Sequence, residues 1–471
     1  MAIGVTIRAG SQDRYNCADL GIALTDFGGG NNVYASTNPF QEIAFMKRAL
    51  IATLSAALAV SGFGYAQQAR LQMVPAPVGS ASAPAIAAHP SPLNIPGAQF
   101  PRIEADSRVT FHFKAPAAQK VQVSINNTPF DMTKGDDGVW TYTSEPQAPG
   151  YHNYWMIVDG AIVLDPGTNA FIGFGHMCNG FEVPDPGVDF YSLKDVPHGN
   201  VLIKNYFSKT ANGWRHIFVY TPPGYDKNTA QRYPVLYLQH GGGEDERVWI
   251  EMGQTNFILD NLLAEGKVKP MIVVMETSAV GPPMQMPPAA GATPRPAGGG
   301  GFRGFPPGGG PYGDLMINDL IPWVDSNFRT LTDKNHRAMA GLSMGGMITE
   351  AVGMSHPEKF AYIGLFSGNR AAMFGQQTPN NQNPDGGKMP PLDLKTLYNG
   401  AMANPAEFNK NVKVFFFSCG SLEKPKNLEI HQEQLVASGI TNSYVYVSPG
   451  TAHEWQTWRR SLYVFAPLLF K

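Results

Sequence analysis

The stretch Gly341-Leu342-Ser343-Met344-Gly345-Gly346 decides the fold of this chain. It follows the short, mainly apolar run 336–340 and precedes a helix-compatible segment, 347–355. A strand, a tight glycine turn and a helix in that order are typical of a nucleophile elbow, where the turn lifts a serine above the sheet edge. The pattern predicts that Ser343 is a nucleophile, and an idle serine in a glycine turn is the alternative.

The sequence also contains the glycine loop, the acid and the histidine that usually accompany such an elbow. The loop His240-Gly241-Gly242-Gly243 lies upstream, while Glu423 and then His453 lie downstream. A serine, an acid and a histidine in this chain order are typical of the α/β-hydrolase fold. We expect the glycine loop to stabilise an oxyanion and His240 to stabilise that loop by a hydrogen bond, with metal binding by His240 as the alternative.

Composition favours an exported, loop-rich globular protein. The chain has 471 residues, which suggests two or three structural units. Charged residues are only 15%, the formal net charge is −2 and no basic patch is present, so we expect no nucleic-acid partner. The three cysteines, at positions 17, 178 and 419, are far apart and indicate neither a disulfide framework nor a zinc site.

A secretory signal peptide is expected at residues 46–66. A basic start, 46–48, is followed by an apolar run, 49–60, and by the small-residue cleavage site 64–66. The apolar run is too short to remain as a membrane span, and a buried helix is the alternative. We therefore expect a secreted or periplasmic protein.

The segments beside this signal are expected to lie outside the folded domains. Residues 1–45 read as an upstream extension from a misassigned start codon, absent from the mature protein. Residues 67–99 are rich in Ala, Pro and Ser, which predicts a flexible linker.

Residues 100–190 are predicted to form a small antiparallel β-sandwich, because short alternating runs are separated by turn signals. The runs are 109–113, 121–125, 138–142, 151–158 and 161–164. Four aromatic residues, Trp140, Tyr151, Tyr154 and Trp155, are expected to fill the core, and stacking on sugars is the alternative.

Residues 200–471 are predicted to form an α/β domain with a mostly parallel sheet covered on both faces, because apolar strands alternate with helical segments. The expected strands are 201–206, 214–221, 233–238, 270–275, 337–340, 360–366, 412–418 and 443–447. The expected helices are 254–265, 314–328, 428–438 and 454–470.

Three segments carry a family resemblance. They are Tyr237–Gly243, Ala340–Gly346 and Ser448-Pro-Gly-Thr-Ala-His-Glu-Trp455, the last followed by Trp-Arg-Arg at 458–460. They resemble the feruloyl and acetylxylan esterases of carbohydrate esterase family one, with the esterase D and enterochelin-esterase-like proteins as wider kin. The region before residue 190 resembles the early-set immunoglobulin-like module, which is similar to family-48 carbohydrate-binding modules.

The resemblance implies that Ser343 is the nucleophile, that His453 is the base and that the acid follows the seventh strand. Many relatives carry aspartate there, and this chain has Glu423. Either carboxylate can orient an imidazole. A solvated loop charge is the alternative for Glu423, and Glu454 is the less favoured orienter because an acid at a helix start interacts favourably with the helix dipole anyway.

Backbone N–H groups are expected to stabilise the oxyanion, those of Met344 and Gly242 above all. Candidate substrate contacts are Trp455, in the resembling segment, and Phe302 and Phe305, in the Gly/Pro-rich insertion 281–313. This insertion is expected to be either a mobile lid over an aromatic acyl group or filler. A second insertion, 369–391, is expected on the same side.

These observations together predict a secreted serine esterase that releases feruloyl or related acyl groups from xylan through an acyl-enzyme. The expected partner is an ester-substituted polysaccharide. No metal or cofactor is expected, because the metal-ligand spacings and phosphate-binding glycine motifs are missing. Acetylxylan esterase, siderophore esterase, peptidase or acyltransferase activity is the enzymatic alternative, a carbohydrate-binding surface protein is the non-enzymatic one, and oligomeric state is left open.

Overall fold

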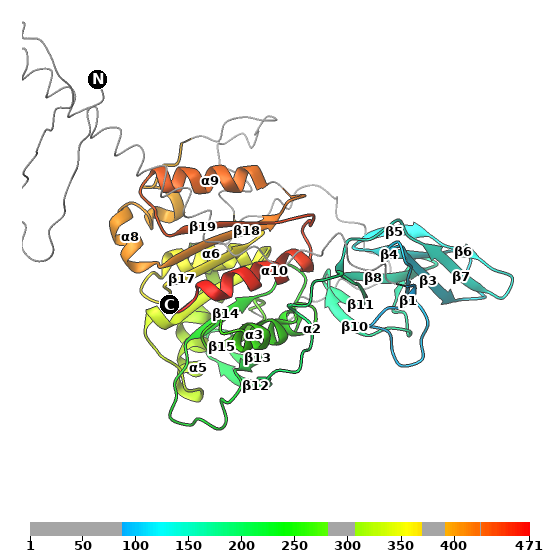
Figure 1. Ribbon diagram of the computed structural model, residues 1–471, viewed down its shortest axis with the longest axis horizontal. Helices are drawn as coiled ribbons and strands as arrows, with labels where there is room; N and C mark the ends of the chain where they lie inside the picture. The colour runs from blue at the N-terminus through cyan, green and yellow to red at the C-terminus, as the bar shows by residue number, and fades with distance from the viewer. Residues whose placement is uncertain (1–86, 281–306, 370–390, 424) are drawn as a thin grey trace, which may run out of the picture. The chain divides into compact units, whose positions relative to one another are not determined.

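The computed structural model describes residues 87–280, 307–369, 391–423 and 425–471 (Figure 1). The predicted upstream extension and signal peptide lie outside the described residues. So do residues 67–86 of the predicted linker and residues 281–306 and 370–390 of the two insertions.

Two antiparallel sheets form the region from residue 89 to residue 183. The first has the strand order β1-β2-β3-β7-β6, and the second has the order β10-β11-β8-β4-β5, with β9 beside β8. Their bounds are His89–Pro90 (β1), Arg102–Ile103 (β2), Val109–Lys114 (β3), Val121–Ile125 (β4), Thr128–Asp131 (β5), Thr133–Lys134 (β6), Val139–Thr143 (β7), Gly150–Val158 (β8), Ala161–Val163 (β9), Ala170–Gly173 (β10) and His176–Val183 (β11). We call this region the β domain.

The two sheets of the β domain enclose one apolar core. Val109 and Phe111 of β3 pack with Val121 and Val123 of β4, as expected where alternate side chains point inward. Trp140 and Tyr154 belong to this core, so the expectation is confirmed for these two. Tyr151 and Trp155 are also buried, but Tyr151 packs in a core shared with the α/β region instead. The likeness to an immunoglobulin-like module stays a prediction.

The prediction of a linker as far as residue 99 is wrong for its last part. Strand β1 pairs with β2, Ser91 N–H donates to the Pro101 carbonyl at 2.9 Å, and Ile95 N–H donates to that of Gly167 at 3.0 Å. Ala/Pro/Ser composition weakens the case for regular structure, but such backbone hydrogen bonds to distant segments are invisible in a local pattern.

A mixed eight-stranded sheet forms the second region, which we call the α/β domain. Its order is β12-β13-β15-β14-β16-β17-β18-β19. The pairs β12 with β13 and β13 with β15 are antiparallel. All the other neighbouring pairs, from β15 with β14 to β18 with β19, are parallel. The bounds are Asn200–Ser208 (β12), Gly213–Thr221 (β13), Val235–Gln239 (β14), Ile272–Glu276 (β15), Arg337–Leu342 (β16), Tyr362–Phe366 (β17), Val414–Gly420 (β18) and Ser443–Ser448 (β19). This sheet is consistent with the expected α/β-hydrolase fold.

Helices cover both faces of this sheet, as the buried parallel strands require. Leu236 and Leu238 of β14 belong to a core with α3 and α10, whereas Val235 and Tyr237 belong to a core with α4, α5, α6, α8 and α9 (Figure 1). The helices are Val248–Glu251 (α2), Thr255–Ala264 (α3), Gly310–Leu315 (α4), Ile321–Asn327 (α5), Met344–Ser355 (α6), Pro405–Asn411 (α8), Pro425–Ala437 (α9) and Trp455–Phe465 (α10).

Two predicted helices differ from the structure in detail. The segment predicted as one helix, 314–328, covers only the end of α4, then a π-helical turn (Met316–Leu320) and α5. The last helix ends at Phe465, before a 3-10 turn (Ala466–Leu468), rather than at residue 470. Pro467 explains the early end, because proline lacks an N–H group and restricts the residue before it.

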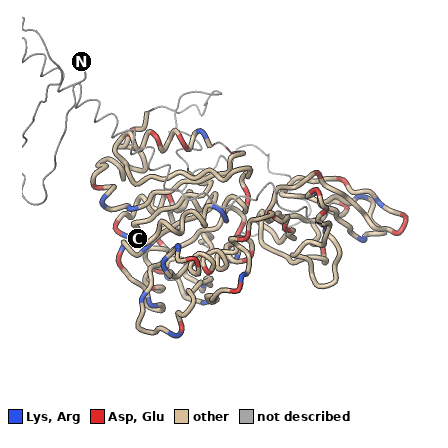
Figure 2. Tube along the Cα trace, viewed as in Figure 1, with Lys and Arg blue, Asp and Glu red and all other residues tan. Residues whose placement is uncertain are grey.

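Buried ion pairs connect α10 to the end of the β domain. The Arg459 side chain is 1% exposed and forms a bidentate ion pair with Glu182, with nitrogen–oxygen distances of 2.6 and 3.1 Å. Arg460 pairs with Asp185 at a nitrogen–oxygen distance of 2.8 Å. Elsewhere Lys and Arg are interspersed with Asp and Glu along the described chain (Figure 2). No helix in the described ranges combines the length and the apolarity needed to cross a membrane.

We expect Glu182→Gln to lower the free energy of unfolding by about 3 kcal/mol, because it leaves the buried Arg459 charge without a counter-charge. Urea unfolding measures the change. Asp131→Asn is the control, since Asp131 and its partner Lys120 are 70% and 59% exposed, and we expect little effect from it. Equal effects of the two substitutions would contradict a structural role for the buried pair.

Candidate active site

Ser343 occupies the sharp turn between β16 and α6. Its backbone has φ 49° and ψ −116°, a conformation that non-glycine residues rarely adopt, and its N–H donates to the Phe366 carbonyl at 2.8 Å. A Cβ atom on Gly341 would lie 2.4 Å from the carbonyl oxygen of Gly345, and one on Gly345 would lie 2.3 Å from that of His240. The two glycines of the elbow are therefore required by close backbone contacts.

The structure brings Ser343, His453 and Glu423 together. His453, in the loop between β19 and α10, lies with Nε2 2.9 Å from Ser343 Oγ and Nδ1 2.8 Å from Glu423 Oε2. A carboxylate accepts hydrogen bonds only, so Nδ1 carries the proton and Nε2 is free to accept one. The His453 side chain is 43% exposed, so it lies open to solvent.

Two further groups hold Glu423, which lies just after β18. Its Oε1 accepts from Gly420 N–H at 2.6 Å and from Ser367 Oγ at 2.7 Å. Burial acts to raise the pKa of Glu423, but the hydrogen bonds from His453, Gly420 and Ser367 outweigh it and leave the pKa below its ordinary value. The carboxylate therefore stays ionised opposite the imidazole.

Trp458 of α10 contacts both Ser367 and His453. Its indole Nε1 donates to Ser367 Oγ at 3.2 Å, and its ring meets the His453 ring edge-on, with centroids 5.1 Å apart. Sequence reasoning missed the role of Ser367. A usable signal existed, because Ser367 directly follows β17, and the carboxyl ends of parallel strands are where α/β sheets form sites.

The less favoured acid, Glu454, has another partner. Its Oε1 accepts from Ala452 N–H at 3.0 Å, just before α10 begins at Trp455. The geometry therefore leaves Glu423 as the acid that contacts the imidazole.

The two predicted oxyanion donors lie beside each other. A Cβ atom on Gly242 would be 3.9 Å from Cβ of Met344. Met344 is the first residue of α6, so no carbonyl of its own helix accepts its N–H. Gly242 thus lies next to the first residue of α6, whose N–H is at a helix N-terminus, where negative charge is stabilised.

Two of the predicted substrate contacts cannot be placed, and the third is corrected. Phe302 and Phe305 lie outside the described residues. Trp455 is only 3% exposed and packs edge-on against Trp249 and Trp458 in the core. Its large indole is removed from water in the core, so it packs the domain instead of contacting substrate.

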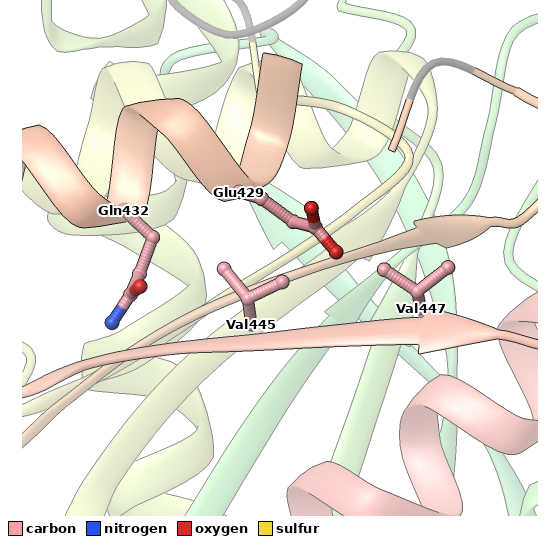
Figure 3. A pocket seen from close by; sticks show the side chains of 4 residues that line it. All are labelled: Glu429, Gln432, Val445 and Val447. Atoms are coloured by element: carbon pink, nitrogen blue, oxygen red, sulfur yellow. The ribbon is translucent and has the colours of Figure 1, made fainter. Parts of the chain in front are cut away.

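In the described part of the chain, no group of three or more His, Cys, Asp or Glu residues is arranged to hold a metal ion. A small hollow lies between α9 and edge strand β19, lined by Glu429, Gln432, Val445 and Val447 (Figure 3). Ser343, Glu423 and His453 do not line it, so we assign no role to it.

The arrangement suits acyl transfer. A serine hydroxyl faces a neutral imidazole nitrogen, the imidazole is oriented by an ionised carboxylate, and the N–H of Met344 directly follows the serine at the start of α6. These are the parts needed to attack a carbonyl carbon and to stabilise the oxyanion that results.

Comparison with known proteins gives a family match over the α/β domain. The family described as "Putative esterase" matches residues 208–467. The chain is 37% identical over 393 residues to "Endo-1,4-beta-xylanase/feruloyl esterase" of Xylanibacter ruminicola, covering 81% of this chain and 47% of that protein. It is 25% identical to "Endo-1,4-beta-xylanase Y" of Acetivibrio thermocellus over 60% of this chain and 24% of that protein.

The chain thus spans less than half the length of these two curated relatives. Among solved structures, the enterobactin esterase of Shigella flexneri has a TM-score of 0.50 at 16% identity, covering 77% of this chain and 93% of that one. At that identity the likeness concerns the fold alone.

We expect Glu423→Gln to slow the labelling of Ser343 by a fluorophosphonate at least about 100-fold, because the amide no longer holds the imidazole in the reactive tautomer. Glu454→Gln is the matched control and should stay within about twofold of the unmodified protein. Rates of covalent labelling are measured by mass spectrometry. A larger effect from Glu454→Gln would show that the acid is assigned wrongly.

Proposed function

Since the chain belongs to the family described as "Putative esterase", a family of carboxylic ester hydrolases, we propose that it is a serine esterase that releases feruloyl or related acyl groups from xylan. The observation that carries the proposal is the hydrogen-bonded series from Ser343 Oγ through His453 to Glu423 on a strained elbow. An intact set of this kind also argues against a purely carbohydrate-binding protein.

In the proposed reaction, Ser343 Oγ attacks the ester carbonyl carbon while His453 Nε2 takes the hydroxyl proton. The carbonyl oxygen becomes an oxyanion that the N–H groups of Met344 and Gly242 stabilise. His453 then gives its proton to the leaving alcohol oxygen, which leaves an acyl-Ser343 ester. A water molecule, activated by His453, cleaves that ester and restores the hydroxyl.

Glu423 contributes by stabilising the imidazolium ion that forms in each step. Its two oxygens have separate tasks: Oε2 faces His453, while Oε1 is occupied by Ser367 and Gly420. The extra methylene of glutamate relative to aspartate is thus compatible with a fixed carboxylate, because two donors anchor its far side.

The feruloyl substrate is supported by the Xylanibacter relative, whose name combines a xylanase and a feruloyl esterase. The alignment with this relative covers 393 residues, which is more than the number of residues in this chain that lie outside the family match. Part of the alignment therefore falls within the esterase family match, 208–467. Acetylated xylan and a cyclic siderophore ester are the alternative substrates. We also propose that the protein is exported, because residues 46–66 have the pattern of a signal peptide.

Ser343→Ala should lower kcat for methyl ferulate by about 1000-fold or more, because the nucleophile is lost while the backbone of the elbow is retained. Circular dichroism of the variant should match that of the unmodified protein. Activity near the unmodified level would refute the assigned nucleophile.

Substrate preference is tested by comparing kcat/KM for a feruloylated xylan oligosaccharide, an acetylated one and a cyclic trilactone siderophore. We expect the feruloyl ester to exceed both others by about tenfold or more, a difference that a site shaped for an aromatic acyl group can supply. The highest value on the trilactone or on the acetyl ester would overturn the feruloyl proposal while leaving the esterase mechanism in place.

A further inference from the structure

The loop His240–Glu244, which we call the oxyanion loop, contains a carboxyl group that the proposed mechanism does not use. Glu244 directly follows the glycines, and its Oε2 accepts the Gly241 N–H at 2.8 Å. A Cβ atom on Gly241 would lie 3.0 Å from this oxygen and 2.5 Å from Leu342 Cδ1, so the carboxyl packs closely against the loop backbone.

The next peptide group of the loop is held by His240. Nε2 of His240 accepts from Ser278 N–H at 2.9 Å, so the neutral ring has its proton on Nδ1, which donates to the Gly241 carbonyl at 2.7 Å. Burial lowers the pKa of His240, which keeps the ring neutral.

These two contacts set the direction of the proposed oxyanion donor. The Gly241 carbonyl and the Gly242 N–H belong to one planar trans peptide, in which C=O and N–H point in opposite directions. His240 therefore fixes the direction of the Gly242 N–H, and Glu244 fixes the peptide before it. A hydrogen bond to the carbonyl also polarises the peptide and strengthens its N–H as a donor.

The surroundings of Glu244 favour a neutral carboxyl group. The residue as a whole is partly exposed, but its carboxyl is buried, and this burial raises the pKa of Glu244 to about 8, with the nearby Asp245 adding to the effect. The Gly241 N–H acts in the opposite direction. Trp455 Nε1 also favours the ionised form by its proximity, although it makes no hydrogen bond of normal geometry.

Among the described residues, none of the groups that act on Glu244 is a cation. Tyr151 of β8 and Cys178 of β11 lie close enough for a charge on Glu244 to raise the pKa of each. Arg247, in the next turn of the chain, is paired with Asp245 at 2.7 Å. A negative charge on Glu244 would therefore be poorly compensated.

We propose that Glu244 is a positioning residue of the oxyanion loop, that its neutral carboxyl group holds the Gly241 N–H during catalysis, and that its ionisation slows the reaction. The proposal rests on the proposed esterase function. The physical reason is electrostatic: a carboxylate two residues from Gly242 opposes the negative charge that develops on the substrate oxygen, and water screens a buried carboxylate poorly.

The sign of the pH effect follows directly. Below about pH 8 Glu244 is neutral and kcat is high, and above it the group ionises and kcat falls. A histidine base alone predicts no such fall, since an imidazole stays deprotonated in alkali. We expect kcat for methyl ferulate to drop about tenfold between pH 7 and pH 9.5, an effect of the size that one nearby charge produces.

The test measures kcat and KM for methyl ferulate from pH 6 to pH 10, corrected for spontaneous hydrolysis. Glu244→Gln preserves size and a carbonyl acceptor for Gly241 N–H but cannot ionise. It should keep kcat within about threefold of the unmodified enzyme at pH 7 and abolish the alkaline fall. Glu244→Ala removes the acceptor and should lower kcat about tenfold at pH 7 with KM changed less than about twofold, as expected when only transition-state binding is lost.

Asp245→Asn is the matched control: it removes the neighbouring acid that adds to the raised pKa of Glu244, so it should retain the alkaline fall and move it to lower pH. An unchanged alkaline fall in Glu244→Gln, or an unmodified kcat in Glu244→Ala, would overturn the proposal. If Glu244→Ala does not fold, the pH profile of Glu244→Gln decides alone. Ser343→Ala distinguishes failure of the proposed function from failure of the role of Glu244. If Ser343→Ala is inactive while the Glu244 variants behave like the unmodified enzyme, only the role of Glu244 is refuted. If Ser343→Ala is active, the proposed function is refuted.

Discussion

The close approach of the elbow to the end of β14 is the constraint on which the rest of the site depends. A Cβ atom on Gly345 would collide with the carbonyls of Gln239 and His240, so α6 begins in direct backbone contact with the oxyanion loop. This contact places the first N–H of α6 beside the glycines that follow His240. The turn that carries Ser343 and the proposed oxyanion loop are therefore in direct contact, which suits a site whose dipoles are oriented before the substrate arrives.

Helix α10 ties that turn to the remainder of the molecule. It begins two residues after His453, and Trp458 supports both the imidazole and Ser367, which in turn holds Glu423. The following arginine, Arg459, is paired with Glu182 of the β domain while buried. The end of the β domain is thus connected to His453 through α10. This structural link between the β domain and the site does not depend on whether the β domain binds sugar.

Much of the α/β domain was predictable, because its buried strands are continuous apolar runs and its helices are separated by clear turn signals. The predicted segment 201–206 lies within β12, 443–447 within β19, and 254–265 contains α3. The errors have physical causes. Residues 87–99 are ordered by backbone hydrogen bonds to distant segments, and Trp455 is buried because every residue of α10 is buried in the domain.

The sequence by itself determined the elbow, the order of strands and helices, and the presence of a serine, an acid and a histidine, since glycine patterns and apolar periodicity act over a few residues. Only the tertiary structure decided that Glu423 and not Glu454 meets the imidazole, that Ser367 anchors it, and that Glu244 lies under the oxyanion loop. His453 and Ser343 are 110 residues apart along the chain. Contacts at such separations depend on which strands lie side by side and how each side chain is buried, and no local pattern records either.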